Sequence, residues 1–392
     1  MDKLHQTLTQ RVGPLAGLGD LLATFEIDPA RVMEPLGVTA AQLTPEARLP
    51  MATALALLER AAALTSCPHF GLLLGARYDH RVFGVIGDMM ACAPTLGTAL
   101  RAYVGVQIGY SRGAIVYLQR AGDDYLLGYG VYDTAGTEGG RQIYDLVVAL
   151  GANTIRSLTE HRAGPLRILE CCSPPDQMAP YARILKAPTL FDQEQTGLLL
   201  SGHHMDMKLP HADSETYQRL RAAVAAMVRG DLNDLAARVR HALRPRLMLG
   251  EASRDAVAHE LGLGPRTLAR QLAAAGTSFE TIKDEVRLVV ARELLLLTDL
   301  RVGQVAEALS YATHSAFVHA FQRWMGLSPG AWRAAQKPAS SGETLPQGTA
   351  GDGTCRRGPA GPAPGAGPAS PRLSRRRRAP PRTGRGWRWS PR

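Results

Sequence analysis

Apolar side chains recur at every third or fourth position in three stretches of the N-terminal part of the chain. In the first stretch, residues 51–66, Leu55 and Leu58 lie on one face of a helix. The same spacing predicts two further helices, over 95–110 and over about 140–159. Each of these helices has an apolar side that requires a partner, so we expect them to pack together in one folded unit.

The pattern changes to short β-branched and aromatic runs between the second and the third of these helices. Residues 114–118 and 125–131 have this composition, and the turn sequence Ala-Gly-Asp-Asp at 121–124 connects them. A further strand is predicted over 166–171. Helices and strands together predict an α+β fold for residues 1–230. No glycine-rich nucleotide-binding motif and no HExxH motif occurs in this region.

The segment that begins at Ser253 has the signals of two short helices with a tight turn between them. Ser253 is a good N-cap, and Gly262 ends the first helix. Pro265 suits the first turn of the second helix, in which Leu268 and Leu272 lie on one face. Two short helices joined by a turn that contains glycine are typical of a helix-turn-helix unit.

The same pattern returns 49 residues further along the chain, where Leu268 corresponds to Phe317 and Leu272 to Phe321. Together with Trp324, these two phenylalanines are expected in the core of a second unit. The helices predicted for this second copy cover residues 302–309 and 314–325, with a break at Ser310-Tyr311 and an end at Gly326.

A long amphipathic helix is predicted between the two copies, over residues 280–297. Its apolar side carries Ile282, Val286 and Val290. At about 1.5 Å per residue it spans roughly 25 Å. Such a rod could set two recognition helices about one DNA turn apart, roughly 34 Å. Residues 231–336 therefore predict an all-α domain with two helix-turn-helix units joined by a linker helix.

Positive charge is concentrated at the C-terminal end of the chain. The 392 residues include 45 Lys and Arg against 35 Asp and Glu, a net charge of +10. Residues 337–392 contain 12 basic and 2 acidic side chains, together with 10 Gly and 10 Pro. This composition predicts a disordered tail, because too little apolar surface can be buried to offset the entropy of ordering. A protein that coats nucleic acid along its whole length is excluded. Specific contacts of the folded part with nucleic acid must therefore come from individual side chains at defined positions and not from bulk charge.

Compartment and redox state follow from the apolar runs and the cysteines. The N-terminal sequence lacks the apolar stretch of a secretory signal. The most apolar run, residues 289–297, carries Arg292 and Glu293 inside it and is too short to span a membrane. Five cysteines, with Cys171 and Cys172 adjacent, fit neither a CxxC motif nor a zinc site. We therefore expect a cytoplasmic protein with reduced thiols.

No cofactor and no metal is expected. His203, His204, Asp206 and His211 form a metal-like cluster, but the loop composition around Pro210 indicates surface histidines. The acidic residues and serines show no catalytic spacing, so we do not expect an enzyme.

The motifs PRTLARQL, DEVR and SAFVHAFQRWMGLSP, followed by Trp-Arg, resemble the C-terminal DNA-binding domain of AraC/XylS-type bacterial transcription regulators. Upstream, FGLLLGARYDHRVFGVIG, APTLGTALRAY and LPHAD are similar to the arabinose-binding-type N-terminal domain often attached to that module. The resemblance implies an effector-binding or dimerisation domain in residues 1–230, a double helix-turn-helix DNA-binding domain in 231–336 and a tail in 337–392.

The resemblance also implies which side chains touch DNA, because the second helix of each unit enters the major groove in this family. Arginine can bond guanine in bidentate fashion, glutamine can do the same to adenine, and alanine can contact a thymine methyl. Arg266 and Arg270 would otherwise be read as a solvated helix face. Carried over by position, the DNA-facing residues are Arg266, Ala269, Arg270 and Gln271 in the first unit, and His314, Ser315, His319, Gln322 and Arg323 in the second.

Two departures from the family pattern weaken the second unit. His319 stands where the family often has Arg, which reduces phosphate or guanine contact at neutral pH. Ser310-Tyr311 stands where Gly-Phe is usual. A residue other than glycine fits that turn only with a negative φ or with backbone strain.

The partners implied are double-stranded DNA in its major groove, a small-molecule effector and a second copy of the chain, with RNA polymerase as a further candidate and no membrane. An alternative stays open: an effector-independent DNA-binding protein whose N-terminal domain serves only dimerisation or partner contact.

Overall fold

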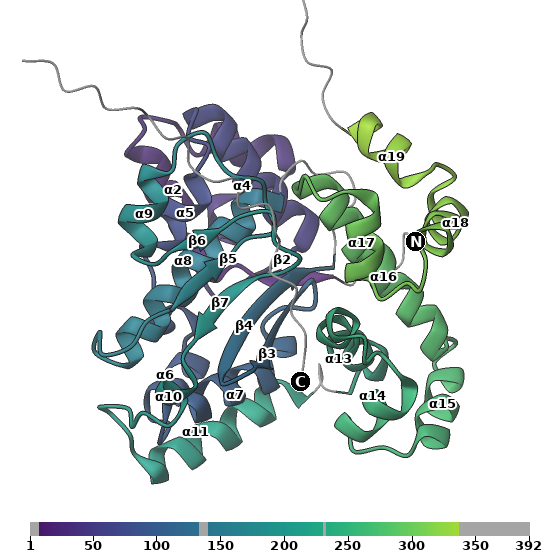
Figure 1. The fold of residues 1–392 in the computed structure, drawn as a ribbon. Coiled ribbons are helices and arrows are strands. Elements are labelled where there is room, and N and C mark those ends of the chain that lie inside the picture. The colour runs from purple at the N-terminus through teal and green to yellow at the C-terminus, as the bar shows by residue number, and fades with distance from the viewer. Residues whose placement is uncertain (1–7, 133–139, 230–232, 337–392) are drawn as a thin grey trace, which may run out of the picture. The chain divides into compact units, whose positions relative to one another are not determined.

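The predicted hairpin is present and begins a five-stranded sheet (Figure 1). β3 (Ala114–Ala121) pairs with β4 (Asp124–Val131), and Gly122 between them has a φ of +66°. The strand order is β3-β4-β7-β5-β6, with β5 and β6 parallel and the other pairs antiparallel. The remaining strands are β5 (Arg167–Leu169), β6 (Thr189–Leu190) and β7 (Thr196–Leu200). The computed structural model describes residues 8–132, 140–229 and 233–336.

α8 (Gly140–Leu158) is the helix predicted over 140–159, and it packs against α5 (Phe70–Gly75). A Cβ added at Gly71 would lie 2.0 Å from the carbonyl oxygen of Gln142, so only glycine permits this close approach. The other N-terminal helices are α2 (Leu18–Ala23), α3 (Ala30–Met33), α4 (Met51–Thr65), α6 (Val85–Ala91), α7 (Leu96–Val106), α9 (Ala179–Leu185), α10 (Gly202–Met205) and α11 (Ser214–Met227), and β1 (Thr9–Arg11) pairs with β2 (Arg48–Pro50).

The second region of the chain is helical, as predicted. Leu268, Leu272, Phe317 and Phe321 are fully buried, so the two units have the core that their spacing predicted. Trp324 is only half-buried, and Trp332 instead packs against Phe321, with ring centroids 5.8 Å apart. The helices of this second region are α13 (Leu235–Leu249), α14 (Arg254–Glu260), α15 (Pro265–Ala274), α16 (Phe279–Leu297), α17 (Val302–Ala308), α18 (His314–Met325) and α19 (Pro329–Gln336).

The described parts of both regions belong to one compact unit, so the division at residues 230 and 231 stays a prediction. The tail for which disorder is predicted, and Cys355 within it, lie outside the described residues. Cys67, Cys92, Cys171 and Cys172 are free thiols.

Candidate functional site

The first predicted helix-turn-helix unit is formed by α14 and α15. Ser253 caps α14 by accepting a hydrogen bond from the backbone N–H of Ala256 (3.2 Å). Gly262 follows the end of this helix with a φ of +70°, and Pro265 is the first residue of α15. The predicted caps and turn are confirmed in this unit.

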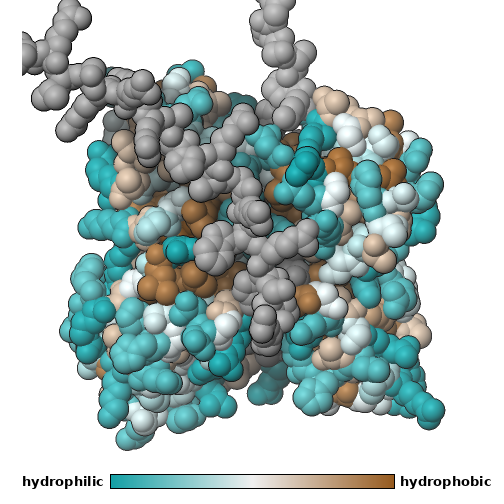
Figure 2. Space-filling model, in the orientation of Figure 1, coloured by the Kyte–Doolittle hydropathy of each residue, from teal (hydrophilic) through white to brown (hydrophobic). Residues whose placement is uncertain are grey.

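The outer face of α15 carries the side chains that the resemblance assigns to DNA. Arg266, Arg270 and Gln271 are exposed, whereas Ala269 is half-buried. Figure 2 shows a mainly hydrophilic and neutral surface over α14 and α15, at the lower right of the view. The contact of these residues with bases stays a prediction.

The turn of the second unit, between α17 and α18, is one residue longer than the first. The first helices of the two pairs begin 48 residues apart, at Arg254 and Val302, and the second helices 49 residues apart. Ser310 takes the left-handed conformation, with a φ of +58°. Its hydroxyl donates a hydrogen bond to the carbonyl oxygen of Leu247 (2.7 Å), at the end of α13. Of the two outcomes that the missing glycine left open, the turn therefore takes the strained one, and a tertiary hydrogen bond partly offsets the strain.

Tyr311 packs in the core of the second unit at the position where the family usually has Phe. The centroid of its ring lies 5.5 Å from that of Phe317, and the guanidinium of Arg287 lies over the Tyr311 ring, 4.7 Å from its centroid. The departure at this position therefore preserves the core of the second unit.

The outer face of α18 is exposed but partly occupied by an ion pair. His314, Ser315, His319 and Gln322 are exposed. Arg323 is exposed too, but its guanidinium lies 3.2 Å from Asp284 on α16. Arg323 therefore contacts a carboxylate of its own chain in this arrangement.

A buried ion pair joins the helical region to the sheet, and sequence reasoning did not predict it. Arg244 on α13 lies 2.5 Å from Glu293 on α16, and their side chains are 5% and 1% exposed. Arg244 also donates to the carbonyl oxygen of Val131 at the end of β4 (3.1 Å). A Cβ at Gly130 would lie 2.0 Å from the Arg244 Nε. Glu293 inside an apolar run was the one available signal, but its partner lies 49 residues earlier.

A cavity of about 90 Å³ lies within the N-terminal region. Its wall combines the segment after β1, α7, β4 and α8, with Val147 and Thr154 from α8 and Tyr129 from β4. Among the described residues that line it, none is an Asp, Glu, Lys, Arg or His. Sequence reasoning missed this cavity, because its wall comes from elements far apart in the chain.

Three of the six polar side chains in the lining of this cavity are tyrosines: Tyr103, Tyr110 and Tyr129. Burial raises the pKa of each hydroxyl above its usual value, so all three stay protonated at neutral pH. The ring of Phe83 packs on Tyr103 and on Tyr110, with centroids 5.0 and 5.3 Å away.

Several polar atoms in the wall have no hydrogen-bond partner. These are the hydroxyls of Tyr110 and Thr154 and the side-chain oxygen of Gln107. The three residues are 5%, 4% and 2% exposed, respectively. Buried polar atoms are nearly always paired in folded proteins, so a cluster of unpaired ones around a cavity is a feature of a ligand site.

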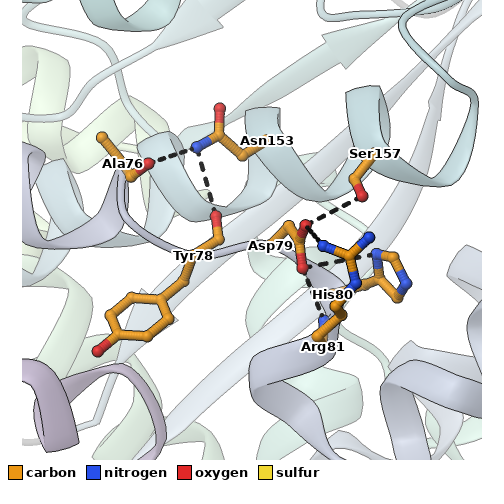
Figure 3. Close-up of polar contacts among 7 residues, drawn as sticks. All are labelled: Ala76, Tyr78, Asp79, His80, Arg81, Asn153 and Ser157. Carbon is orange, nitrogen blue, oxygen red and sulfur yellow. Dashed lines mark hydrogen bonds and ion pairs between the residues drawn. The ribbon is translucent and has the colours of Figure 1, made fainter.

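A polar cluster holds the segment that carries Phe83 against α8 (Figure 3). The Asn153 side chain donates to two carbonyl oxygens of the segment after α5, at 2.9 and 3.3 Å. The Ser157 hydroxyl donates to Asp79 (3.0 Å), whose other oxygen caps the following short helix, His80–Phe83. Thr154 lies between these two anchors on α8, so the anchors fix one wall of the cavity.

Two buried acids form a second polar cluster, away from the cavity lining. Asp145 and Glu170 are 1% and 0% exposed. The Tyr181 hydroxyl donates to Asp145 (2.8 Å), and Arg141 lies 3.9 Å from the same carboxylate. Burial raises the pKa of Asp145 to about 7, against the opposing effect of Arg141, and burial also raises the pKa of Glu170.

The metal-like cluster of the sequence does not come together as a site among the described residues, which contain no group of three or more potential metal ligands. His203 and His204 lie on α10, and His211 lies 3.9 Å from Glu160. Of the helices that the structure describes, none is long and apolar enough to cross a membrane.

Two helix-turn-helix units that follow an α+β region in the chain are the architecture of a DNA-binding transcription regulator. Residues 27–209 match the family model described as the arabinose-binding domain of AraC transcription regulator, N-terminal, and residues 257–335 match a helix-turn-helix domain. The chain belongs to the AraC family of bacterial transcription regulators, with an arabinose-binding-type N-terminal domain.

The curated relatives of this chain are transcription regulators, and two of them match it along most of their own length. The HTH-type transcriptional regulator VirS of Mycobacterium tuberculosis is 27% identical over 333 residues, which cover 83% of this chain and 96% of VirS. The ornithine utilization regulator of Pseudomonas aeruginosa is 25% identical over 81% of this chain and 94% of its own length. An HTH-type regulator of Mycobacterium bovis is 49% identical over 73 residues, 19% of this chain and 21% of that protein.

Proposed function

We propose that this protein reads operator DNA with both helix-turn-helix units, and that its N-terminal region binds a small-molecule effector. In this proposal α15 and α18 enter successive major grooves on one face of a duplex. The proposal goes beyond family membership, because it assigns the reading side chains and an effector site.

The exposed polar face of α15 is the observation that carries the DNA-reading part. Arg266, Arg270 and Gln271 have free exposed side chains on one helix, which suits bidentate contacts to guanine and adenine. α16 has 19 residues and is therefore about 28 Å long. This length is comparable with the roughly 34 Å that separates successive major grooves on one face of DNA. Figure 1 has α15 and α18 on the same side of the view, which agrees with this arrangement.

We expect the two units to contribute unequally. Arg323 must leave Asp284 before it can contact DNA, and the imidazole of His319 offers fewer hydrogen-bond donors to phosphate than the guanidinium of arginine. The first unit has no such cost among its described DNA-facing side chains. Base discrimination is therefore expected to come mainly from α15.

The cavity supports effector binding over the alternative of an N-terminal domain that serves only dimerisation. It is lined mainly by residues of the core and has unpaired polar atoms in its wall, which a purely structural domain does not require. A second copy of the chain and RNA polymerase stay predicted partners.

The test is specific DNA binding by the full chain. Operator sites are first located by footprinting across the genome, and fluorescence anisotropy then compares operator with random DNA at one fixed salt concentration. Arg266→Ala and Arg270→Ala together are expected to reduce the ratio of the two affinities by at least about tenfold, since each good base pair contact discriminates by roughly 1–3 kcal/mol.

Arg254→Ala is the control for the loss of an arginine charge outside α15, because Arg254 is exposed on α14 of the same unit. Loss of one charge there should weaken the binding of operator and of random DNA by the same factor, and should therefore leave the ratio of the two affinities unchanged. An unchanged ratio in the double variant would refute the assignment of α15.

A further inference from the structure

The wall of the cavity also indicates the chemical class of the effector. We infer that the cavity binds a small uncharged molecule with an apolar body and a hydroxyl group, such as a phenol or a short alcohol. This inference rests on the proposed effector-binding role of the N-terminal region.

The absence of charge in the wall excludes ionic ligands. None of the described lining residues carries an ionisable acid or base other than tyrosine, and burial keeps those tyrosines protonated. An ammonium or carboxylate group would lose its hydration there without gaining a counter-charge. An amino acid with charged groups at both ends is therefore a poor fit.

The unpaired polar atoms require both a donor and an acceptor. The Gln107 amide already donates to the carbonyl oxygen of Ala114 (3.2 Å), which leaves its side-chain oxygen as an acceptor. The hydroxyls of Tyr110 and Thr154 can donate or accept. A ligand hydroxyl has both capacities, so it complements this set. A free sugar carries several hydroxyls and would leave most of them unpaired against aliphatic and aromatic side chains.

The volume limits the size of the apolar body. The cavity holds about 90 Å³, less than the 150 Å³ of an engineered apolar cavity that binds benzene. A short alkyl chain fits this space, and a single ring fits with small side-chain adjustments. The wall contributes Val147, Leu100 and Phe83 as apolar contacts for such a body.

The experiment measures dissociation constants of simple probes for the full chain by ligand-observed NMR titration. 1-Butanol and n-butylammonium have the same number of heavy atoms, so their comparison isolates charge. We expect 1-butanol to bind at least about 100-fold more tightly, because the ammonium finds no counter-charge. L-Arabinose and L-ornithine serve as probes of the two excluded classes.

Phenol and toluene isolate the hydroxyl. In Tyr110→Phe and Thr154→Val, singly and combined, the ratio of phenol to toluene affinity should fall by about 3- to 10-fold, the worth of one hydrogen bond. The melting temperature without ligand should not fall in Tyr110→Phe, because the hydroxyl removed has no partner. Tyr132→Phe is the matched control, since Tyr132 is also 5% exposed with an unpaired hydroxyl but does not line this cavity.

Val147→Phe fills the cavity and should abolish binding of phenol and of 1-butanol, which assigns the site. Equal binding of 1-butanol and n-butylammonium, or an unchanged phenol-to-toluene ratio in the combined variant, would overturn the inference. Binding of L-arabinose or L-ornithine that Val147→Phe abolishes would overturn the ligand class but leave the effector role. Binding of no probe would remove the effector part of the proposed function as well, while the operator assay decides the DNA part separately.

Discussion

Arg244 and Glu293 form an almost fully buried ion pair, 2.5 Å apart, between the helix that begins the DNA-binding region and the linker helix. The third partner of this pair is the carbonyl oxygen of Val131, which belongs to the sheet. The Arg244 guanidinium on α13 therefore bonds one residue of α16 and one of β4. Its loss affects all three elements, which are distant in the chain.

Arg244→Met is expected to destabilise the protein by about 3–5 kcal/mol, because it leaves the Glu293 carboxylate buried without a partner. Arg240→Met is the matched control. Arg240 lies 3.0 Å from Glu285, but these side chains are 16% and 34% exposed, so the loss should be at most about 1 kcal/mol. Urea denaturation of both variants measures the difference, and equal losses would contradict this view of the pair.

Gly130→Ala is expected to destabilise the protein by about 1–3 kcal/mol, because the new Cβ would lie 2.0 Å from the Arg244 Nε. Gly105→Ala is the control, since Gly105 lies in α7 with no atom within 4 Å of an added Cβ and should gain up to about 1 kcal/mol. In the Arg244→Met background the cost of Gly130→Ala should shrink, and denaturation of the double variant measures this coupling. Full additivity would show that the clash is not with Arg244.

Ser310→Ala is expected to be less stable than Ser310→Gly. Both lose the hydrogen bond to Leu247, worth about 1 kcal/mol. Glycine also removes the left-handed strain at a φ of +58°, about 1–2 kcal/mol, and should therefore stay near the wild type. Thermal unfolding measures the order, and an alanine variant as stable as the glycine variant would contradict the strain.

The contribution of Asp145 to the stability of the protein should fall as pH rises from about 4 to about 7. Burial raises the pKa of Asp145 to about 7, so the folded protein binds a proton in this range that the unfolded chain has released. Deprotonation of Asp145 therefore favours the unfolded state, by more than about 1 kcal/mol over the range. Asp145→Asn should remove this contribution, so its free energy of unfolding should rise relative to that of the wild type between pH 4 and 7, whereas Asp176→Asn, at an exposed position, should keep a constant difference. An identical slope in the wild type and Asp145→Asn would refute the assignment.

The helix-turn-helix units could be predicted from the sequence because their signals are local. Caps such as Ser253, the glycine at 262 and the proline at 265 lie within a few residues of the helix ends that they define. The choice at Ser310 between a negative φ and backbone strain could be named for the same reason, but only the structure shows that strain is the outcome.

The cavity and the buried pair could not be predicted, because both depend on contacts between distant segments. Thr154 and Tyr110 are 44 positions apart, and each reads as an ordinary helix or loop residue on its own. Spacing alone predicts Trp324 in the core, but the tryptophan that is buried against Phe321 is Trp332 of α19. Spacing indicates which face of a helix is apolar, and tertiary packing decides which of its residues are covered.

The tight fit of Arg244 against Gly130 has a practical meaning for anyone who builds hybrid regulators. A chimera joined near residue 231 takes Gly130 and Val131 from one parent, and Arg244 and Glu293 from the other. A donor with a larger side chain at the first position, or a recipient without the arginine and its carboxylate, would leave a clash or a stranded charge at the junction. These four positions are best transplanted as a set.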